Sequence, residues 1–239
     1  MCDNVKVLAS DFDLTIFYPY DQEKTNKNIE AIRRFIAAGN LFCIVTGRNL
    51  TRLKEDIDKY NIPFSYLICE DGAKIFDGEY YCLHTTLLRE EEIQKVIKIL
   101  EEDNIEYYLD DGYGETTNHT DCVKIVVRCL DPLERDRIVR LVRDKVDIHI
   151  YASTKHVNII DKDVNKEMAL KTLFCLEKLD INELYTIGDS DNDYEMLKAF
   201  KGAIVKAHSK GLDELGKEEY DTFSDYVDKL LEKDKLFKI

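Results

Sequence analysis

The sequence predicts an α/β protein with a doubly wound, parallel, Rossmann-like sheet and an α+β domain inserted into it. In residues 1–83, short apolar segments alternate with amphipathic ones, which is typical of parallel strands separated by helices. Residues 84–162 instead repeat the order helix, strand, strand, which indicates an antiparallel sheet with helices on one face. The first pattern returns over 163–239. We therefore expect a core of 1–83 and 163–239, and an inserted domain of 84–162.

The first part of the core is expected to alternate strands and helices. Strands are predicted over 5–10, 41–45 and 66–69, helices over 28–38 and about 49–60, and a hairpin within 73–83. The segment 41–45 is wholly apolar, as expected of a strand buried on both faces. Ile29, Ile32 and Ile36 recur at helical spacing in the first helix, and the hairpin is expected to turn at Asp77-Gly78.

The insertion and the second part of the core follow in the same way. In the insertion we expect helices over 90–103 and 133–145 and strands over 105–109, 122–130, 147–152 and 156–160. After it we expect helices over 165–179 and 191–200, strands over 184–188 and 203–206, and a C-terminal helix.

Composition excludes several classes of function. The 239 residues include 34 Lys and Arg against 48 Asp and Glu, a net charge of −14, which repels nucleic acid. The longest apolar run, 41–45, is far shorter than the roughly 20 residues of a membrane span. Residues 1–4 lead into no signal peptide, so we expect a cytoplasmic protein. A monomer and a homodimer both fit this composition.

Side chains that could take part in catalysis follow the predicted strands. Asp11 and Asp13 come after the first strand, Thr46 after the second and Asp189 after the strand at 184–188, while Lys166 lies near a helix start. In an open parallel sheet these ends share one edge, where ligands bind. Residues i and i+2 of an extended chain point the same way, so Asp11 and Asp13 can face one substrate. Asp11 and Asp189 could hold Mg²⁺, and Lys166 could help to offset the charge of a phosphate.

These residues carry a resemblance to a known family. Asp11-Phe-Asp13-Leu-Thr15, Thr46-Gly-Arg48, Lys166 and Gly188-Asp189-Ser-Asp-Asn192-Asp193 resemble the four motifs of the haloacid dehalogenase superfamily of phosphohydrolases. The insertion resembles the α+β cap (type IIB) of the Cof-type sugar-phosphatase branch. The resemblance spans essentially the whole chain.

The resemblance implies a role for each matched residue. Asp11 would be the nucleophile that forms an aspartyl-phosphate, and Asp13 would be the general acid and then the general base. Thr46 would bind the transferring phosphoryl group, and Lys166 would neutralise it. The implied cofactor is Mg²⁺, held by the Asp11 side chain, the Asp13 carbonyl and Asp189. Supporting positions would be Asn192, Asp193, Gly47 and Arg48.

Two departures from the family pattern stand out. Leu14 follows Asp13 where this branch usually has glycine. Glu70-Asp71-Gly72-Ala73 stands where relatives often have Asn-Gly-Ala. Asp71 would repel a nearby phosphate, so we expect it either to point away or to pair with a substrate cation or a lysine.

For recognition of the leaving group we nominate residues of the insertion. Lys124, Arg128 and Asn158 are the first candidates, followed by His149, Tyr151 and His156. Lys124 and Arg128 lie on one face of their strand, and this face either covers the active site or faces solvent.

The expected function is that of a Mg²⁺-dependent phosphatase acting on a small phosphorylated metabolite, a sugar phosphate or a related compound. One alternative is a phosphomutase or other phosphotransferase, in which a second alcohol replaces water. Another is a non-catalytic protein that binds a phosphorylated metabolite.

Overall fold

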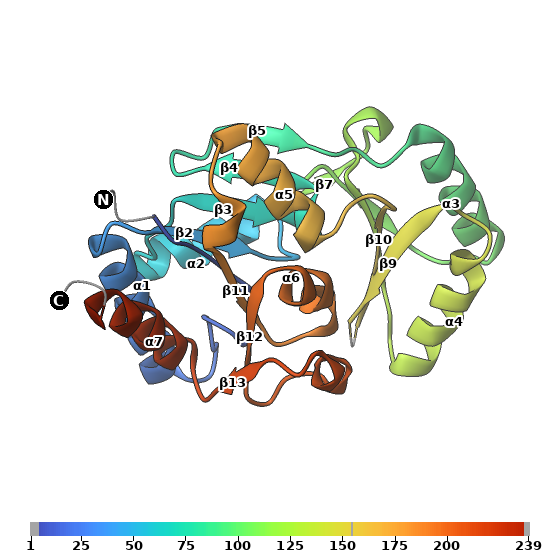
Figure 1. Cartoon of the computed structure of the whole chain (residues 1–239). Helices are drawn as coiled ribbons and strands as arrows, with labels where there is room; N and C mark the ends of the chain where they lie inside the picture. The colour runs from blue at the N-terminus through green and yellow to red at the C-terminus, as the bar shows by residue number, and fades with distance from the viewer. Residues whose placement is uncertain (1–4, 154, 237–239) are drawn as a thin grey trace.

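The core of the molecule is one mixed eight-stranded sheet (Figure 1). The computed structural model describes residues 5–153 and 155–236. The prediction that no signal peptide is present concerns residues 1–4, which lie outside the described residues. The strand order is β13-β12-β11-β1-β2-β3-β4-β5. These strands are β1 (Val7–Ser10), β2 (Leu41–Val45), β3 (Tyr66–Cys69), β4 (Lys74–Asp77), β5 (Cys82–Thr85), β11 (Leu184–Gly188), β12 (Lys201–Val205) and β13 (Glu218–Tyr220). Neighbouring strands from β13 to β3 pair in parallel, whereas β4 pairs antiparallel with both β3 and β5.

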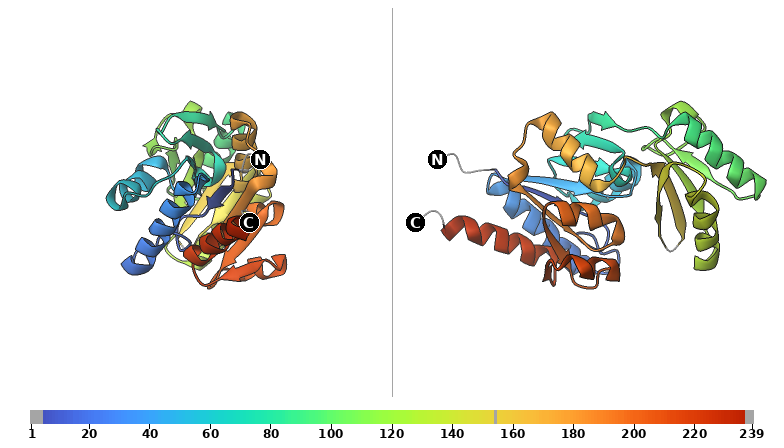
Figure 2. Two further views of the ribbon diagram at one scale, coloured as in Figure 1. Left: turned by 60° about the vertical axis from the view of Figure 1, so that its left-hand side comes forward. Right: turned by 45° about the vertical axis from the view of Figure 1, so that its right-hand side comes forward.

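Helices cover both faces of this sheet, as the doubly wound prediction requires. They are α1 (Gln22–Ala37), α2 (Leu50–Tyr60), α5 (Lys166–Glu177), α6 (Tyr194–Ala199) and α7 (Phe223–Leu236). Apolar residues of α1, α2 and α7 form one buried cluster with the sheet, and those of α5 and α6 form a second. Short 3₁₀ helices span Glu70–Gly72, His119–Asp121, Ile181–Glu183, Asp191–Asp193 and Lys210–Leu215. The described ends of the chain lie at the side of the core away from the insertion (Figure 2).

The insertion has its own antiparallel sheet, in the order β7-β6-β8-β10-β9. Its elements are α3 (Glu90–Glu102), β6 (Tyr108–Asp110), β7 (Glu115–Thr116), β8 (Lys124–Arg128), α4 (Pro132–Arg143), β9 (Ile148–Ala152) and β10 (His156–Asp161). Alternate residues such as Ile125, Val127, Val157 and Ile159 are buried with apolar residues of α3 and α4. The opposite face of the sheet is therefore left to look toward the core.

Several predicted boundaries were wrong. Helix α1 begins at Gln22 rather than residue 28, because the side chain of Asp21 accepts a hydrogen bond from the Lys24 amide and caps a polar first turn. Strand β6 begins at Tyr108 rather than 105, and β12 spans Lys201–Val205 rather than 203–206. The helix predicted over 191–200 starts as the 3₁₀ turn Asp191–Asp193. The short strands β7 and β13 were not predicted, and two or three residues are too few to show periodicity.

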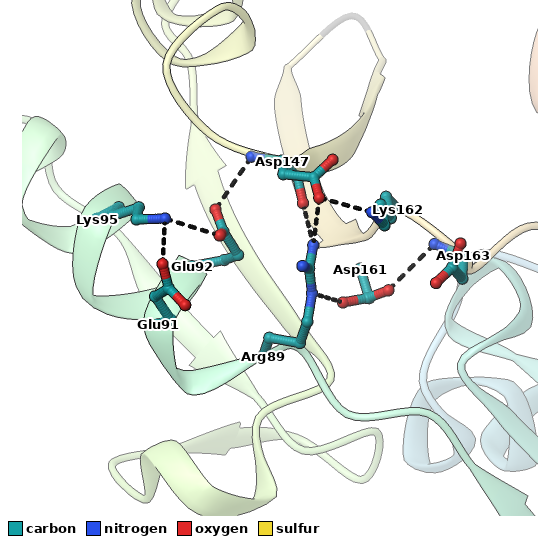
Figure 3. Close-up of polar contacts among 8 residues, drawn as sticks. All are labelled: Arg89, Glu91, Glu92, Lys95, Asp147, Asp161, Lys162 and Asp163. Atoms are coloured by element: carbon teal, nitrogen blue, oxygen red, sulfur yellow. Dashed lines mark hydrogen bonds and ion pairs between the residues drawn. The ribbon is translucent and has the colours of Figure 1, made fainter.

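A network of charged side chains joins the two connections between insertion and core (Figure 3). Arg89, which precedes α3, donates from Nε to Asp161 at the end of β10, at 2.9 Å. Its guanidinium also contacts Asp147, which binds Lys162 at 2.7 Å. The amide of Asp147 donates to Glu92 of α3 at 3.0 Å. The segment that leads into the insertion is thus joined by a hydrogen-bonded ion pair to the segment that leads out of it.

Candidate active site

The predicted site residues follow neighbouring strands of the core sheet. Asp11 comes directly after β1, Thr46 after β2 and Asp189 after β11. β1 pairs in parallel with β2 on one side and with β11 on the other, so the three strand ends meet at one edge. They line a cavity of about 810 Å³ whose other walls come from neighbouring loops and helices of the core and from the insertion. The edge predicted from the sequence is therefore the floor of a large cavity.

Lys166 is buried beneath this edge and bridges two carboxylates. The side chain of Asn165 caps α5, which makes Lys166 the first residue of the helix. Its Nζ lies 2.6 Å from Asp11 Oδ1 and 2.6 Å from Asp193 Oδ1. Burial disfavours the ammonium form, but Asp11 and Asp193 outweigh burial and raise the pKa of Lys166. The lysine is therefore a fixed positive charge beside Asp11.

Asp11 lies in a crowded acidic environment. Burial raises its pKa well above the ordinary value; Lys166 opposes this rise, and Asp193 and Asp189 add to it. Burial and Asp193 also raise the pKa of Asp189 to about 6. Thr15 donates to Asp189 at 3.0 Å and fixes that carboxylate. A positive charge placed between Asp11 and Asp189 would relieve both shifts.

Asp193 orders the loop that carries Asp189. Its Oδ2 accepts hydrogen bonds from the amides of Asp189, at 3.0 Å, and Ser190, at 3.1 Å. A Cβ at Gly188 would come within 2.4 Å of Asp193 Oδ2, so only glycine fits there. With its Oδ1 bound to Lys166, Asp193 has both oxygens engaged by the protein. Its arrangement is that of a positioning residue.

The donor set fits a hard divalent cation. Carboxylate oxygens of Asp11, Asp189 and Asp193 lie within 4.8 Å of one another, and all three residues are buried. Three carboxylates against the single ammonium of Lys166 leave two negative charges, which a divalent ion would balance. Because oxygen ligands are those that Mg²⁺ and similar ions prefer, the cluster could hold such an ion.

Asp13 points toward the cavity but is bound by Arg48. The Arg48 guanidinium donates to both Asp13 oxygens, from Nε at 2.8 Å and from a terminal nitrogen at 2.5 Å, and to Asp56 at 2.7 Å. Leu14, one of the two departures noted in the sequence, adopts a left-handed φ of 63°. Glycine adopts this conformation without strain. Leucine accepts the strain here with a side chain that is 53% exposed and lines the cavity.

Asp71 borders the site and does not point away. It is 1% exposed, its amide donates to the Thr46 carbonyl at 3.0 Å, and its Oδ1 accepts from Asn192 Nδ2 at 2.9 Å. A Cβ on Gly47 would lie 2.8 Å from the same Oδ1. The side-chain partner of Asp71 is thus the amide of Asn192, and the predicted pairing with a substrate cation or a lysine stays a prediction.

Lys124 joins the insertion to the core through a buried ion pair that the sequence did not reveal. Its ammonium contacts Glu70 of the loop after β3, and it donates to the Gly47 carbonyl at 3.2 Å. The two side chains are 6% and 0% exposed. Burial raises the pKa of Glu70 to about 7, although Lys124 acts to lower it. A second link joins Asn49 Nδ2 to Asp110 at 3.1 Å.

The polar face of the insertion's sheet covers the cavity, which decides between the two orientations left open. Lys124 and Asn158 line the cavity, together with Tyr108, Asp110, His149, Tyr151 and His156. Arg128, the remaining candidate, is not among the lining residues. It is exposed, forms an ion pair with Glu115 at 3.3 Å and lies over the Tyr108 ring. Arg52 of α2 also lines the cavity and was missed, because one arginine on a polar helix has no distinguishing pattern.

Comparison with known proteins identifies the family. The model of haloacid dehalogenase-like hydrolases matches residues 8–124 and 110–210. The chain belongs to this family. A Bacillus subtilis relative, named 5-amino-6-(5-phospho-D-ribitylamino)uracil phosphatase, is 23% identical over 82% of this chain and 81% of its own. The chain is thus a haloacid dehalogenase-like hydrolase, similar to a protein that is named as a phosphatase.

Solved structures show the same fold. The phosphatase BT1666 from Bacteroides thetaiotaomicron superposes with a TM-score of 0.80 at 18% identity, over 96% of this chain and 95% of its own. The subclass IIB sugar phosphatase BT4131 superposes with a TM-score of 0.76 at 15% identity, over 95% of this chain and 99% of its own. The fold is thus that of a haloacid dehalogenase core with a type IIB cap. Among the described residues, no helix is long and apolar enough to cross a membrane.

Proposed function

We propose that this hydrolase is a Mg²⁺-dependent phosphatase that acts on a small phosphate monoester, a sugar phosphate or a related metabolite, through an aspartyl-phosphate. The observation that carries the proposal is the buried triad of Asp11, Lys166 and Asp193, of which Asp11 lines the cavity and the other two lie beneath it. The lysine holds one Asp11 oxygen at 2.6 Å, which leaves the other to attack phosphorus.

The chemistry follows from the positions of the protein groups. Asp11 attacks phosphorus, the bond from phosphorus to the leaving oxygen breaks, and Asp13 gives its proton to that oxygen. For this step the contact between Asp13 and Arg48 must loosen, because the paired form is the carboxylate. Water then attacks the aspartyl-phosphate, Asp13 takes up its proton, and Asp11 and inorganic phosphate are released. Thr46 hydrogen-bonds the transferring phosphoryl group, and Lys166 offsets its charge from beneath and steadies Asp11.

Asp11, Asp189 and the Asp13 carbonyl would hold the Mg²⁺. When bound, it supplies positive charge that offsets repulsion between the phosphate and the carboxylates. We assign Asn192 and Asp193 to the support of this site, since Asp193 is fully engaged by Lys166 and two amides. Gly47 provides room beside Asp71.

We assign the choice of leaving group to the cap, expected over 84–162, with Lys124 and Asn158 on its cavity face. Arg128 could take part only by leaving Glu115 and turning inward. The names of the B. subtilis phosphatase and of the subclass IIB sugar phosphatase support a small phosphorylated metabolite as substrate.

The test is release of inorganic phosphate from sugar phosphates, nucleotides and p-nitrophenyl phosphate, with Mg²⁺ or with EDTA. We expect metal-dependent release that Asp11→Asn abolishes. Asp58→Asn is the matched control, since Asp58 lies on the surface of α2 with a 59% exposed side chain. Phosphate transfer from a labelled ester to an added alcohol, in place of release, would indicate a phosphotransferase. Binding without turnover would indicate a non-catalytic protein.

A further inference from the structure

Arg52 is a charged residue of the cavity that the mechanism does not use. It lies on α2 one turn after Arg48 and is exposed where it lines the cavity. Arg48 is held by Asp13 and Asp56. The Arg52 guanidinium, by contrast, has no hydrogen-bond or ion-pair partner among the residues that the structure describes.

Arg52 is one of several cationic side chains that act on His156 of the cap. The pKa of His156 is lowered first by burial and then by Arg128, Arg52, Lys124 and Lys155. Of these four cations, Arg52 and Lys124 line the cavity, and Lys124 is already paired with Glu70. Arg52 therefore presents an unmet positive charge to the cavity in a protein whose net charge is −14.

This charge is separate from the phosphate site. Asp11 follows β1 and is bonded to Lys166 at 2.6 Å, whereas Arg52 lies on α2. The positive charge beside the nucleophile is therefore supplied by Lys166. A cavity of about 810 Å³ has room for a ligand that reaches from the nucleophile to α2.

We propose that Arg52 is a specificity-determining residue that binds an anionic oxygen group, a carboxylate or a second phosphate, on the leaving group. The preferred substrate is then a phosphate monoester with a second negative charge. A guanidinium suits this role because its fixed fork of donors matches the two oxygens of such a group. The assignment rests on the proposed phosphatase function.

The test compares esters that differ only at the end far from the scissile phosphate. Glucitol 6-phosphate, 6-phosphogluconate and glucitol 1,6-bisphosphate end in a hydroxymethyl group, a carboxylate and a phosphate. Glycerol 3-phosphate and 3-phosphoglycerate form a shorter pair. We expect wild-type kcat/KM to favour the anionic members, and the preferred one identifies carboxylate or phosphate as the group bound.

Arg52→Gln should lower kcat/KM for the anionic esters by about 10- to 100-fold, and for the neutral ones by less than about threefold. Arg52→Lys should recover part of the loss, because it keeps the charge and loses the fork. Lys54→Gln is the matched control: it removes one positive charge from the same helix, but Lys54 pairs with Asp58 outside the cavity. Equal losses on neutral and anionic esters, or no wild-type preference, would overturn the proposal.

Failure of the phosphatase function gives a different result. In that case no ester is hydrolysed by the wild-type protein. Calorimetric titration of 6-phosphogluconate into Asp11→Asn, with and without Arg52→Gln, then tests Arg52 alone. Weaker binding in the double variant supports the assignment, and unchanged binding refutes it.

Discussion

Replacing Lys124 with methionine tests the buried link between cap and core. The substitution removes one member of an ion pair whose side chains are 6% and 0% exposed, and leaves Glu70 without its counter-charge. Breaking such a pair from one side costs about 3–5 kcal/mol. For a protein of this size, each kcal/mol lowers the Tm by about 2–4 °C, so we expect a fall of about 6–20 °C. Differential scanning calorimetry measures it.

The loss of stability caused by Lys124→Met should depend on pH, and the surroundings of Glu70 predict the direction of this dependence. The pKa of Glu70 is raised from an ordinary value of 4.5 to about 7, so the folded state binds this proton more tightly than the unfolded state. The contribution of Glu70 to stability is therefore fully present below pH 4.5 and is lost as the pH rises through about 7. Without Lys124, ionised Glu70 destabilises the folded state further. The loss of stability caused by Lys124→Met should therefore increase between about pH 5.5 and about pH 8.5.

The double variant Glu70→Gln with Lys124→Met separates the ion pair from the shape of the side chains. It carries neither charge, so we expect it to recover more than half of the loss at high pH. A single variant within about 0.5 kcal/mol of the wild type, or a penalty that does not change with pH, would refute the reasoning.

Two further substitutions test the floor of the site. Lys166→Met leaves Asp11 and Asp193 without their shared cation. Phosphate release should therefore fall by more than about 10³-fold, and the free energy of unfolding measured in urea should fall by about 3–5 kcal/mol. Wild-type activity or wild-type stability in this variant would contradict the assignment. Gly72→Ala should cost about 2–4 kcal/mol, since φ is +120° and a Cβ would lie 2.5 Å from the carbonyl of the residue that caps α5. Gly114→Ala is its control, with nothing within 4 Å of the added Cβ, and equal stability of the two variants would count against this account.

Sequence reasoning could predict which residues meet at the candidate site, because this needed only local patterns. Asp11, Thr46 and Asp189 each follow an apolar strand, and the rule that parallel strand ends share an edge brings them together. Lys166 could be included because the helix that follows the insertion has to begin near it. No long-range packing had to be known for any of these assignments.

The contacts between cap and core could not be predicted in this way. Glu70 and Lys124 belong to different sheets, and their pairing depends on how the cap sits on the core. Alternation along β8 showed that Lys124 and Arg128 share a face, but not that only Lys124 would reach the core. The free guanidinium of Arg52 is likewise recognisable only once its neighbours are known.

The bond between Arg89 and Asp161 gives the insertion a modular character. Bringing the two ends of a long inserted segment together has an entropic cost that the host fold ordinarily meets. Here Arg89 and Asp161, both side chains of the insertion itself, hold those ends side by side, and Asp147 joins Arg89 to Lys162 as well. The insertion therefore keeps its own two ends together, and its separate links to the core, such as that between Lys124 and Glu70, are left to set how it sits over the active site.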